Sequence, residues 1–365
     1  MPEENKELNP FRHWMGLSDL ECYVPRKSLN QLVQSSLKTF VDTGRAPNYA
    51  FYGKSGSGKS LLLEYIANHY CGSEKKILPL RIDAGDALGR YSYASFMGLV
   101  LKALEEEYRK QSIFAKVWHK LSNIKVGEIG TNLGGVGVHV KLLGADEKEL
   151  EREFAINGRK RLVQSISKVK KVLGVERVLI LVDEADSMTS ELAGDIKQLL
   201  RGIDNPGYCM FIASVAQKVL PMPTEEDESN PEKSKWRAFD PIKIEPFKHS
   251  EFFDLISKAL ERHEKLYNSL WVMVESTYDA IYTLCDGSPL FAHKIAYFAF
   301  EHGKILPERK FCLTQEAWDA FLVSEQQRAD RFIDIFNNKR DEIQLGDLYK
   351  SENGGSSKSE EALGK

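Results

Sequence analysis

The sequence predicts an α/β fold, in which a parallel sheet carries helices on both faces and a smaller all-helical domain follows. Apolar runs with strand character alternate with helical patterns between about residues 45 and 247, which is typical of a parallel sheet. Beyond this stretch only helical periodicity appears, which indicates a separate domain. A length of 365 residues, 42% of them hydrophobic and 28% charged, agrees with a globular protein of two or three domains.

These changes of pattern divide the chain into segments. Residues 1–44 combine a polar, proline-punctuated stretch with an amphipathic helix, and residues 45–247 form the sheet domain. Residues 248–340 form the helical domain. Residues 341–365, which are rich in Gly, Ser, Lys and Glu, are predicted to be disordered.

The stretch 102–174 is predicted to be an insertion in the sheet domain, because strand–helix alternation resumes only after it. Within it, residues 124–142 alternate valines with polar or glycine positions around a Gly-Gly pair, which indicates a hairpin. This hairpin would either protrude and touch DNA or a protein, or pack on its own domain.

One stretch matches the pattern G-x-x-x-x-G-K-[ST] at every fixed position. It consists of Gly53, Lys54, Ser55, Gly56, Ser57, Gly58, Lys59 and Ser60. An apolar run precedes it and a helical pattern beginning at Leu61 follows it, which is the context of a phosphate-binding loop. Glycines there let backbone N–H groups turn inward at a helix N-terminus. We expect these residues and Leu61 to bind ATP, with Lys59 at the β- and γ-phosphates and Ser60 on Mg²⁺.

A second motif follows the continuous apolar run 178–182, which has the composition of a strand buried on both faces. The run ends in Asp183 and Glu184. Carboxylates at the carboxyl end of a parallel strand lie in the crevice where ligands bind. Asp183 is therefore expected to hold Mg²⁺ through its water shell, and Glu184 to orient and deprotonate the attacking water. The alternative is an acidic strand end that caps the following helix.

The composition of the chain bears on its binding partners and on its cellular compartment. The formal net charge of −3 predicts no global attraction to nucleic acid, so any such binding needs a local patch. The five cysteines are scattered and form no C-x-x-C pair, which predicts free thiols in a reducing compartment. Neither a signal-peptide pattern nor a run of 18 apolar residues is present, so we expect a cytoplasmic protein that does not contact a membrane.

Taken together, these motifs resemble AAA+ ATPases, and among them the replication-initiator/origin-recognition clade and the related STAND-type switch ATPases. The residues that carry the resemblance are the glycine-rich loop, Asp183-Glu184, the polar strand end at Ser214 and the turn Gly287-Ser288-Pro289. The resemblance covers roughly residues 20–330. It implies an ATPase that uses Mg²⁺, converts ATP and water into ADP and phosphate, and acts as a homo-oligomer.

The resemblance also implies roles for single residues. Ser214 would be the sensor-1 residue, with its hydroxyl between the water and the γ-phosphate. Arg201 occupies the place where many AAA+ proteins carry an arginine finger for the neighbouring subunit, although a positive charge at a helix C-terminus is equally well explained by the helix dipole. Arg26 resembles the residue of the N-terminal segment that lies near the adenine.

The Gly-Ser-Pro turn departs from the initiator pattern. Initiators usually place an arginine for the γ-phosphate where this sequence has Leu290. Lys294, about one helical turn later, is a possible substitute. The Gly-x-Pro form is more similar to the switch ATPases, in which Pro289 would pack against the nucleotide.

A basic stretch bears on partners. It contains Arg159, Lys160, Arg161, Lys168, Lys170, Lys171 and Arg177, opposed only by Glu176. A helix with this charge could contact DNA phosphates, and it could equally be a solvated helix face.

Two functions therefore stay open. The first is an oligomeric AAA+ ATPase that assembles or remodels a nucleic-acid-associated complex, which the basic stretch and the hairpin favour. The second is a slow, STAND-like nucleotide switch that regulates a protein partner in a mobile-element or defence system, which Leu290 favours.

Overall fold

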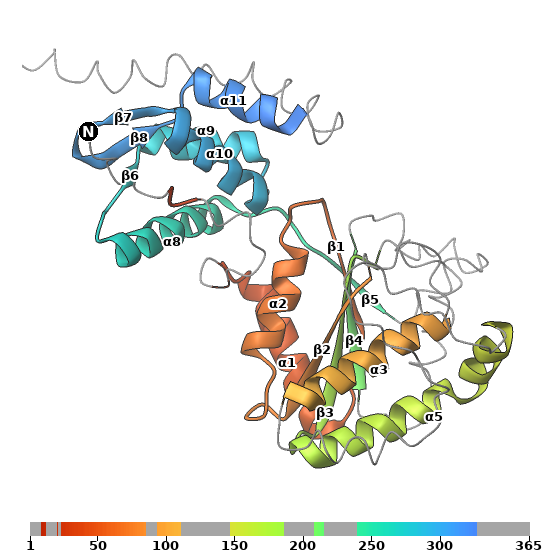
Figure 1. Ribbon diagram of the computed structural model, residues 1–365. Helices are drawn as coiled ribbons and strands as arrows, with labels where there is room; N and C mark the ends of the chain where they lie inside the picture. The colour runs from red at the N-terminus through yellow and green to blue at the C-terminus, as the bar shows by residue number, and fades with distance from the viewer. Residues whose placement is uncertain are drawn as a thin grey trace, which may run out of the picture. The chain divides into compact units, whose positions relative to one another are not determined.

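The computed structural model describes residues 9–11, 20, 23–84, 93–110, 147–185, 208–214 and 239–326, and the statements below concern these residues. The chain divides into two compact units (Figure 1). The sheet unit comprises Lys27–Ser55 and Lys59–Ile244, and the C-terminal unit comprises Met1–Arg26, Gly56–Gly58 and Glu245–Lys365. The tip of the glycine-rich loop (residues 56–58) is thus counted with the C-terminal unit.

A five-stranded, all-parallel sheet with the order β2-β3-β4-β1-β5 forms the centre of the sheet unit. Its strands are β1 (Tyr49–Tyr52), β2 (Ile77–Asp83), β3 (Arg177–Asp183), β4 (Tyr208–Ser214) and β5 (Asp240–Lys243). Strand β3 lies between β2 and β4, and its residues 178–182 are all buried. Burial on both faces explains why this strand reads as a continuous apolar run.

Helices cover both faces of this sheet, as predicted (Figure 1). They are α1 (Lys27–Thr43), α2 (Lys59–His69), α3 (Tyr93–Lys110) and α5 (Glu147–Leu173). On one face, α3 and α5 bury residues such as Phe96 and Leu162 against alternate strand residues, Ala50 among them. On the other face, the rings of Tyr49 and Phe211 contact each other. Helix α1 reaches Tyr49 on that face through a 2.5 Å hydrogen bond with Ser36.

Parts of the stretch predicted to be an insertion, 102–174, contribute to this packing. Residues 102–110 complete α3, and 147–173 form α5, whose Leu162, Ile166 and Val169 are fully buried in the core. The sequence shows the helical period of both helices, but it does not show which surface they pack against. The predicted hairpin at 124–142 lies outside the described residues.

The C-terminal unit is built mainly from helices. They are α8 (His249–Tyr267), α9 (Glu275–Cys285), α10 (Pro289–His302), the 3-10 turn Pro307–Arg309 and α11 (Gln315–Gln326). Their core is aromatic: Trp318 and Phe321 stack at 5.2 Å, and Phe311 is fully buried.

The prediction of an all-helical domain needs one correction. A three-stranded sheet with the order β6-β8-β7 lies among these helices, formed by β6 (Val272–Met273), β7 (Lys304–Leu306) and β8 (Lys310–Cys312). Strands of two or three residues are too short to show an alternating pattern, so the sequence gives no signal for them.

Two expectations drawn from composition can be compared with the described residues. No helix among them is long and apolar enough to cross a membrane. The four described cysteines, Cys71, Cys209, Cys285 and Cys312, are free and buried. Burial raises the pKa of the Cys71 thiol to about 12 and that of Cys209 well above its ordinary value, because a buried site disfavours the thiolate.

Candidate functional site

The glycine-rich loop (residues 53–60) connects β1 to α2, which begins at Lys59. Gly56 and Gly58 adopt φ angles of +74° and +86°, a conformation that residues with a Cβ rarely adopt. The ammonium of Lys59 is buried and donates to the carbonyl oxygens of Gly53 at 3.0 Å and Lys54 at 2.8 Å. The loop therefore folds back on its own lysine. The positive φ angles at Gly56 and Gly58 are typical of loops whose backbone N–H groups bind an anion.

Strand β3 ends in the two predicted carboxylates. Asp183 is half-buried, and its Oδ1 accepts a hydrogen bond of 2.9 Å from the backbone N–H of Glu184. Glu184 is exposed and adopts a φ of +52°, which costs a non-glycine residue about 1–2 kcal/mol. Asp83 pairs in register with Asp183 at the end of β2, so a further carboxylate ends the adjacent strand. Sequence reasoning gave Asp83 no role.

The strand arrangement brings these motifs to one edge of the sheet. All five strands are parallel, so their carboxyl ends share that edge. Helix α2 packs against β3 and β4, which places its first residues, Lys59 and Ser60, at the edge where Asp183 lies. Ser214, the last residue of β4, pairs in register with Tyr52, the last residue of β1. This strand order, with a G-x-x-x-x-G-K-S loop between β1 and α2, is typical of the P-loop nucleoside triphosphatase fold.

Several solved structures are similar in fold to this chain. Orc1 from Aeropyrum pernix, solved in complex with DNA, matches with a TM-score of 0.53 and 13% identity over 87% of this chain and 70% of the Orc1 chain. Cdc6p from Pyrobaculum aerophilum matches with a TM-score of 0.46 and 14% identity over 76% of this chain and 62% of that chain. Domain III of the replication initiation protein DnaA from Thermotoga maritima matches with a TM-score of 0.39 and 13% identity over 78% and 87%.

The chain is structurally similar to AAA+ ATPases. This statement rests on the Orc1 match, which has the highest TM-score of the three. No protein-family model and no curated protein matches the sequence. The chain spans less than two thirds of the Cdc6p chain, so the comparison concerns the fold and not a whole protein's activity.

Three hydrogen-bond donors of the C-terminal unit hold the loop tip. The carbonyl oxygen of Gly56 accepts hydrogen bonds from Ser288 Oγ at 3.2 Å and from the backbone N–H of Leu290 at 3.3 Å. The carbonyl oxygen of Ser57 accepts a 2.8 Å hydrogen bond from Arg26, whose guanidinium lies 4.4 Å from the centre of the Phe247 ring. Burial lowers the pKa of Arg26 from its ordinary value. Its predicted place near the adenine stays a prediction.

Local structure explains each residue of the Gly-Ser-Pro turn. Gly287 has a φ of +66°, and a Cβ there would lie 2.7 Å from Pro246 Cβ and 2.8 Å from the carbonyl oxygen of Phe247. Ser288 is the N-cap of α10, and Pro289 occupies the first turn, where its missing N–H costs nothing. The turn therefore starts α10 at a defined place beside the loop tip, and contact between Pro289 and nucleotide stays a prediction.

Lys294 does not replace the arginine that is absent at Leu290. Its ammonium lies 2.7 Å from Glu325 on α11, and the two side chains are only 5% and 10% exposed. A buried ammonium needs a partner of opposite charge, and Glu325 supplies it from a helix that the local sequence around Lys294 does not reveal. The pair joins α10 to α11, so we assign it to stability.

We expect Lys294→Met to destabilise the protein by about 3 kcal/mol, because it leaves the Glu325 carboxylate buried without its partner. The measurement is urea unfolding of the full chain, followed by far-ultraviolet circular dichroism. The double variant Lys294→Met/Glu325→Leu should recover most of the loss, since it removes both buried charges. Equal stability of Lys294→Met and the unmodified protein would contradict the assignment.

The basic stretch divides between two elements. Arg159, Lys160, Arg161, Lys168, Lys170 and Lys171 lie in α5, where the side chains of Lys160 and Lys171 are exposed and those of Lys168 and Lys170 half-buried. Burial, with Arg177 nearby, lowers the pKa of Lys170.

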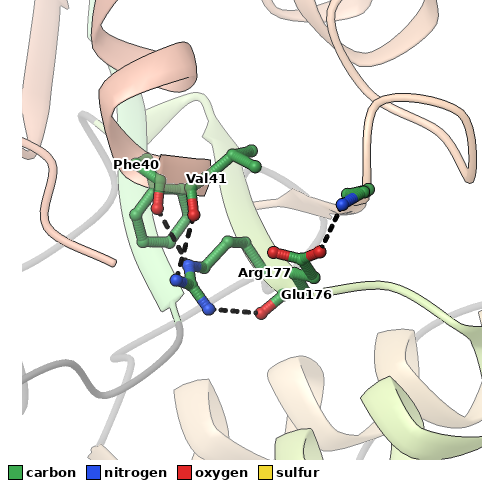
Figure 2. Close-up of polar contacts among 5 residues, drawn as sticks. Phe40, Val41, Glu176 and Arg177 are labelled. Carbon is green, nitrogen blue, oxygen red and sulfur yellow. Dashed lines mark hydrogen bonds and ion pairs between the residues drawn. The ribbon is translucent and has the colours of Figure 1, made fainter. Parts of the chain in front are cut away.

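Arg177, the last cation of the basic stretch, has a structural role in the folded chain. It starts β3 and donates hydrogen bonds to the carbonyl oxygens of Phe40 at 2.8 Å, Val41 at 3.1 Å and Glu176 at 2.9 Å (Figure 2). The acceptors at the end of α1 are more than a hundred residues away in the sequence, so composition alone could not reveal them. Arg177 satisfies the last carbonyls of a helix, which is a structural role. The candidate arginine finger, Arg201, lies outside the described residues.

Proposed function

We propose that this protein binds Mg-ATP and hydrolyses it to ADP and phosphate to drive the assembly or remodelling of a nucleic-acid-associated complex. One observation carries the proposal: the parallel sheet brings the glycine-rich loop and the Asp183–Glu184 strand end to the same edge. Phosphoryl transfer requires a cradle for the phosphates and carboxylates beside it for metal and water. The AAA+ fold, which implies nucleotide binding, supports the same conclusion.

The chemistry of the available donors suits Mg²⁺. Ser60 offers a hydroxyl and Asp183 a carboxylate at the same sheet edge, and Mg²⁺ prefers oxygen ligands. We assign both residues to the metal, Ser60 directly and Asp183 through its water shell. Bound there, Mg²⁺ would neutralise charge on the β- and γ-phosphates.

The protein's own groups then have distinct tasks. Lys59 supplies a positive charge to the β- and γ-phosphates, while the loop amides and Leu61 hold the nucleotide. Glu184 orients the attacking water and takes its proton, and Ser214 hydrogen-bonds between the water and the γ-phosphate. Arg201 of a neighbouring subunit would stabilise the transferred phosphoryl group, so turnover would require a homo-oligomer.

DNA is the nucleic-acid partner that we propose, with α5 as the contacting surface. The exposed ammonium groups of Lys160 and Lys171 and the half-buried Lys168 can approach phosphates without disturbing the core. The solved Orc1 structure is a complex with DNA, which agrees with this choice. The net charge of −3 makes such a contact local to this helix.

A slow, STAND-like switch that regulates a protein partner is the second candidate, and it rests on a specific observation. Leu290 stands where an initiator would have its arginine, and Lys294 is paired with Glu325 in the interior. Without a cation from this part of α10, hydrolysis would be slow and the ATP-bound state long-lived. Such a protein would signal by holding its partner only while ATP is bound.

ATP turnover of the purified chain, measured across protein concentration with and without duplex DNA, separates the two functions. A rate per subunit that rises with concentration and again with DNA supports the DNA-linked oligomer. A slow rate that is indifferent to both supports the switch. Failure to bind ATP at all would reject both functions.

Charge reversal on α5 tests the DNA contact. Lys160→Glu/Lys171→Glu should remove the stimulation by DNA and leave the basal rate unchanged, because both side chains are exposed and other residues of α5 make its core contacts. The matched control is Lys38→Glu/Lys265→Glu, which reverses two exposed lysines on α1 and α8. An equal loss of stimulation in both variants would indicate a general charge effect and reject α5 as the contact.

A further inference from the structure

Two consecutive carbonyl groups at the loop tip are held from outside the loop. Ser288 Oγ and the N–H of Leu290 both donate to the carbonyl oxygen of Gly56. Arg26 donates to the carbonyl oxygen of Ser57, and these contacts all lie within the C-terminal unit. The carbonyl of one residue and the N–H of the next residue belong to the same peptide group. A hydrogen bond that holds the carbonyl oxygen therefore also fixes the direction of that N–H.

The orientation of these two peptide groups determines where their N–H groups point. In a planar trans peptide the C=O and N–H bonds point in opposite directions. The N–H of Ser57 therefore points away from Ser288, and the N–H of Gly58 points away from the Arg26 guanidinium. With positive φ angles at Gly56 and Gly58, successive amides of this kind form a concave site for an anion.

We propose that Ser288 and Arg26 are positioning residues of the phosphate-binding loop, which hold its tip so that the amides of Ser57 and Gly58 face the phosphates before the nucleotide arrives. The inference deepens the proposed function and rests on it. It gives Ser288 and Arg26 a role toward the phosphates of any nucleotide. Neither residue touches the reacting atoms; both act through the backbone of the loop.

Arg26 and Ser288 are both positioned through Phe247. The Arg26 guanidinium lies over the Phe247 ring. The backbone N–H of Phe247 donates a 2.8 Å hydrogen bond to the carbonyl oxygen of Gly287. Gly287 precedes Ser288, whose hydroxyl caps α10 while it holds the loop. One short segment therefore sets the positions of both donors, which is the arrangement expected of a preorganised binding site.

The fit at the tip is close. A Cβ added to Gly56 would lie 3.0 Å from Leu290 Cβ and 3.0 Å from Ser288 Oγ. Arg26 is 7% exposed, and within the described residues its Nε has no hydrogen-bond partner. The Ser57 carbonyl and the Phe247 ring are thus the contacts that locate the guanidinium. Rearrangement of the tip would break them.

Ser288→Ala tests the first donor, with Thr314→Ala as the matched control. Thr314 is also a partly exposed residue whose hydroxyl accepts from the N–H three residues later, at the start of α11. Both variants should lower the melting temperature, because both remove a helix cap. Only Ser288→Ala should weaken ATP and ADP binding, by about three- to tenfold, as expected for one lost hydrogen bond. Ser288→Thr, which keeps a hydroxyl, should restore binding.

Arg26→Met tests the second donor, because methionine keeps an apolar contact with Phe247 and removes the hydrogen bond. Calorimetry with ATP, GTP and inorganic triphosphate measures the effect. We expect about tenfold weaker binding of all three ligands, in equal proportion, because the loop contacts only phosphates. A loss confined to ATP would instead assign Arg26 to the base and overturn the proposal for this residue.

The outcomes separate this inference from the proposed function. If the unmodified protein binds none of the three ligands, the proposed function fails and the inference with it. If it binds them and Ser288→Ala binds as tightly as the unmodified protein, the proposed function stands and the role of Ser288 is rejected. Equal weakening in Ser288→Ala and Thr314→Ala would show that the effect follows from lost stability and would also reject it.

Discussion

Replacing Lys59 by alanine is expected to abolish nucleotide binding, with an affinity loss greater than about 100-fold. Lys59 is buried, and its ammonium group donates hydrogen bonds to the carbonyl oxygens of Gly53 and Lys54 within the loop. The other lysine of the loop, Lys54, is exposed. A phosphate that enters the cradle would meet this charge in a site shielded from water, where charge-assisted hydrogen bonds are strong. The measurement is calorimetric titration of the full chain with Mg-ATP.

Lys54→Ala is the matched control for this experiment. Lys54 lies in the same loop but its side chain is exposed, while its backbone carbonyl, the acceptor for Lys59, is unchanged by the substitution. We expect it to bind ATP within about twofold of the unmodified protein, as is usual for an exposed charge. Binding by Lys59→Ala with unchanged affinity would contradict the assignment of the loop as the phosphate site.

Glu184→Gln is expected to keep ATP binding and to reduce turnover by at least about 100-fold, the scale of a lost general base. The substitution preserves the size of the side chain and removes its capacity to take a proton. The backbone N–H of residue 184 still donates to Asp183, so the end of β3 and its metal ligand should stay in place. Steady-state turnover and binding affinity, measured on the same sample, separate the two effects.

Glu176→Gln is the corresponding control, because Glu176 precedes the same strand and its side chain forms an exposed ion pair with Lys76 at 2.6 Å. Such surface pairs contribute little, so both turnover and affinity should be unchanged. Normal turnover in Glu184→Gln would move the role of base to another group at this sheet edge, and the carboxylate of Asp83 is the nearest alternative on the adjacent strand.

Features that depend on neighbouring residues could be predicted from the sequence. The parallel sheet with helices on both faces follows from apolar periodicity, and the strand at 178–182 follows from a single buried run. The glycine-rich loop is equally local, since backbone freedom at Gly56 and Gly58 sets its shape. The roles of Lys59 and Glu184 remain predictions, and the experiments above test them.

Features that depend on distant partners could not be predicted. Lys294 lies about one helical turn after Leu290, and Arg177 ends a basic stretch. Only the packing shows that Lys294 pairs with Glu325 and that Arg177 binds carbonyl groups at the end of α1. The β6-β8-β7 sheet was missed because strands of two or three residues carry no pattern of their own.

The fold class and the two motifs of the candidate site could thus be predicted from local sequence, because strand burial and loop conformation depend on a few consecutive residues. The groups that hold the loop tip are visible only in the folded chain. Ser288 and Gly56 are 232 residues apart in the chain, and Arg26 and Ser57 are 31 apart. A hydrogen bond between a side chain and a remote carbonyl leaves no periodic trace in the sequence, so only the folded chain shows which groups meet.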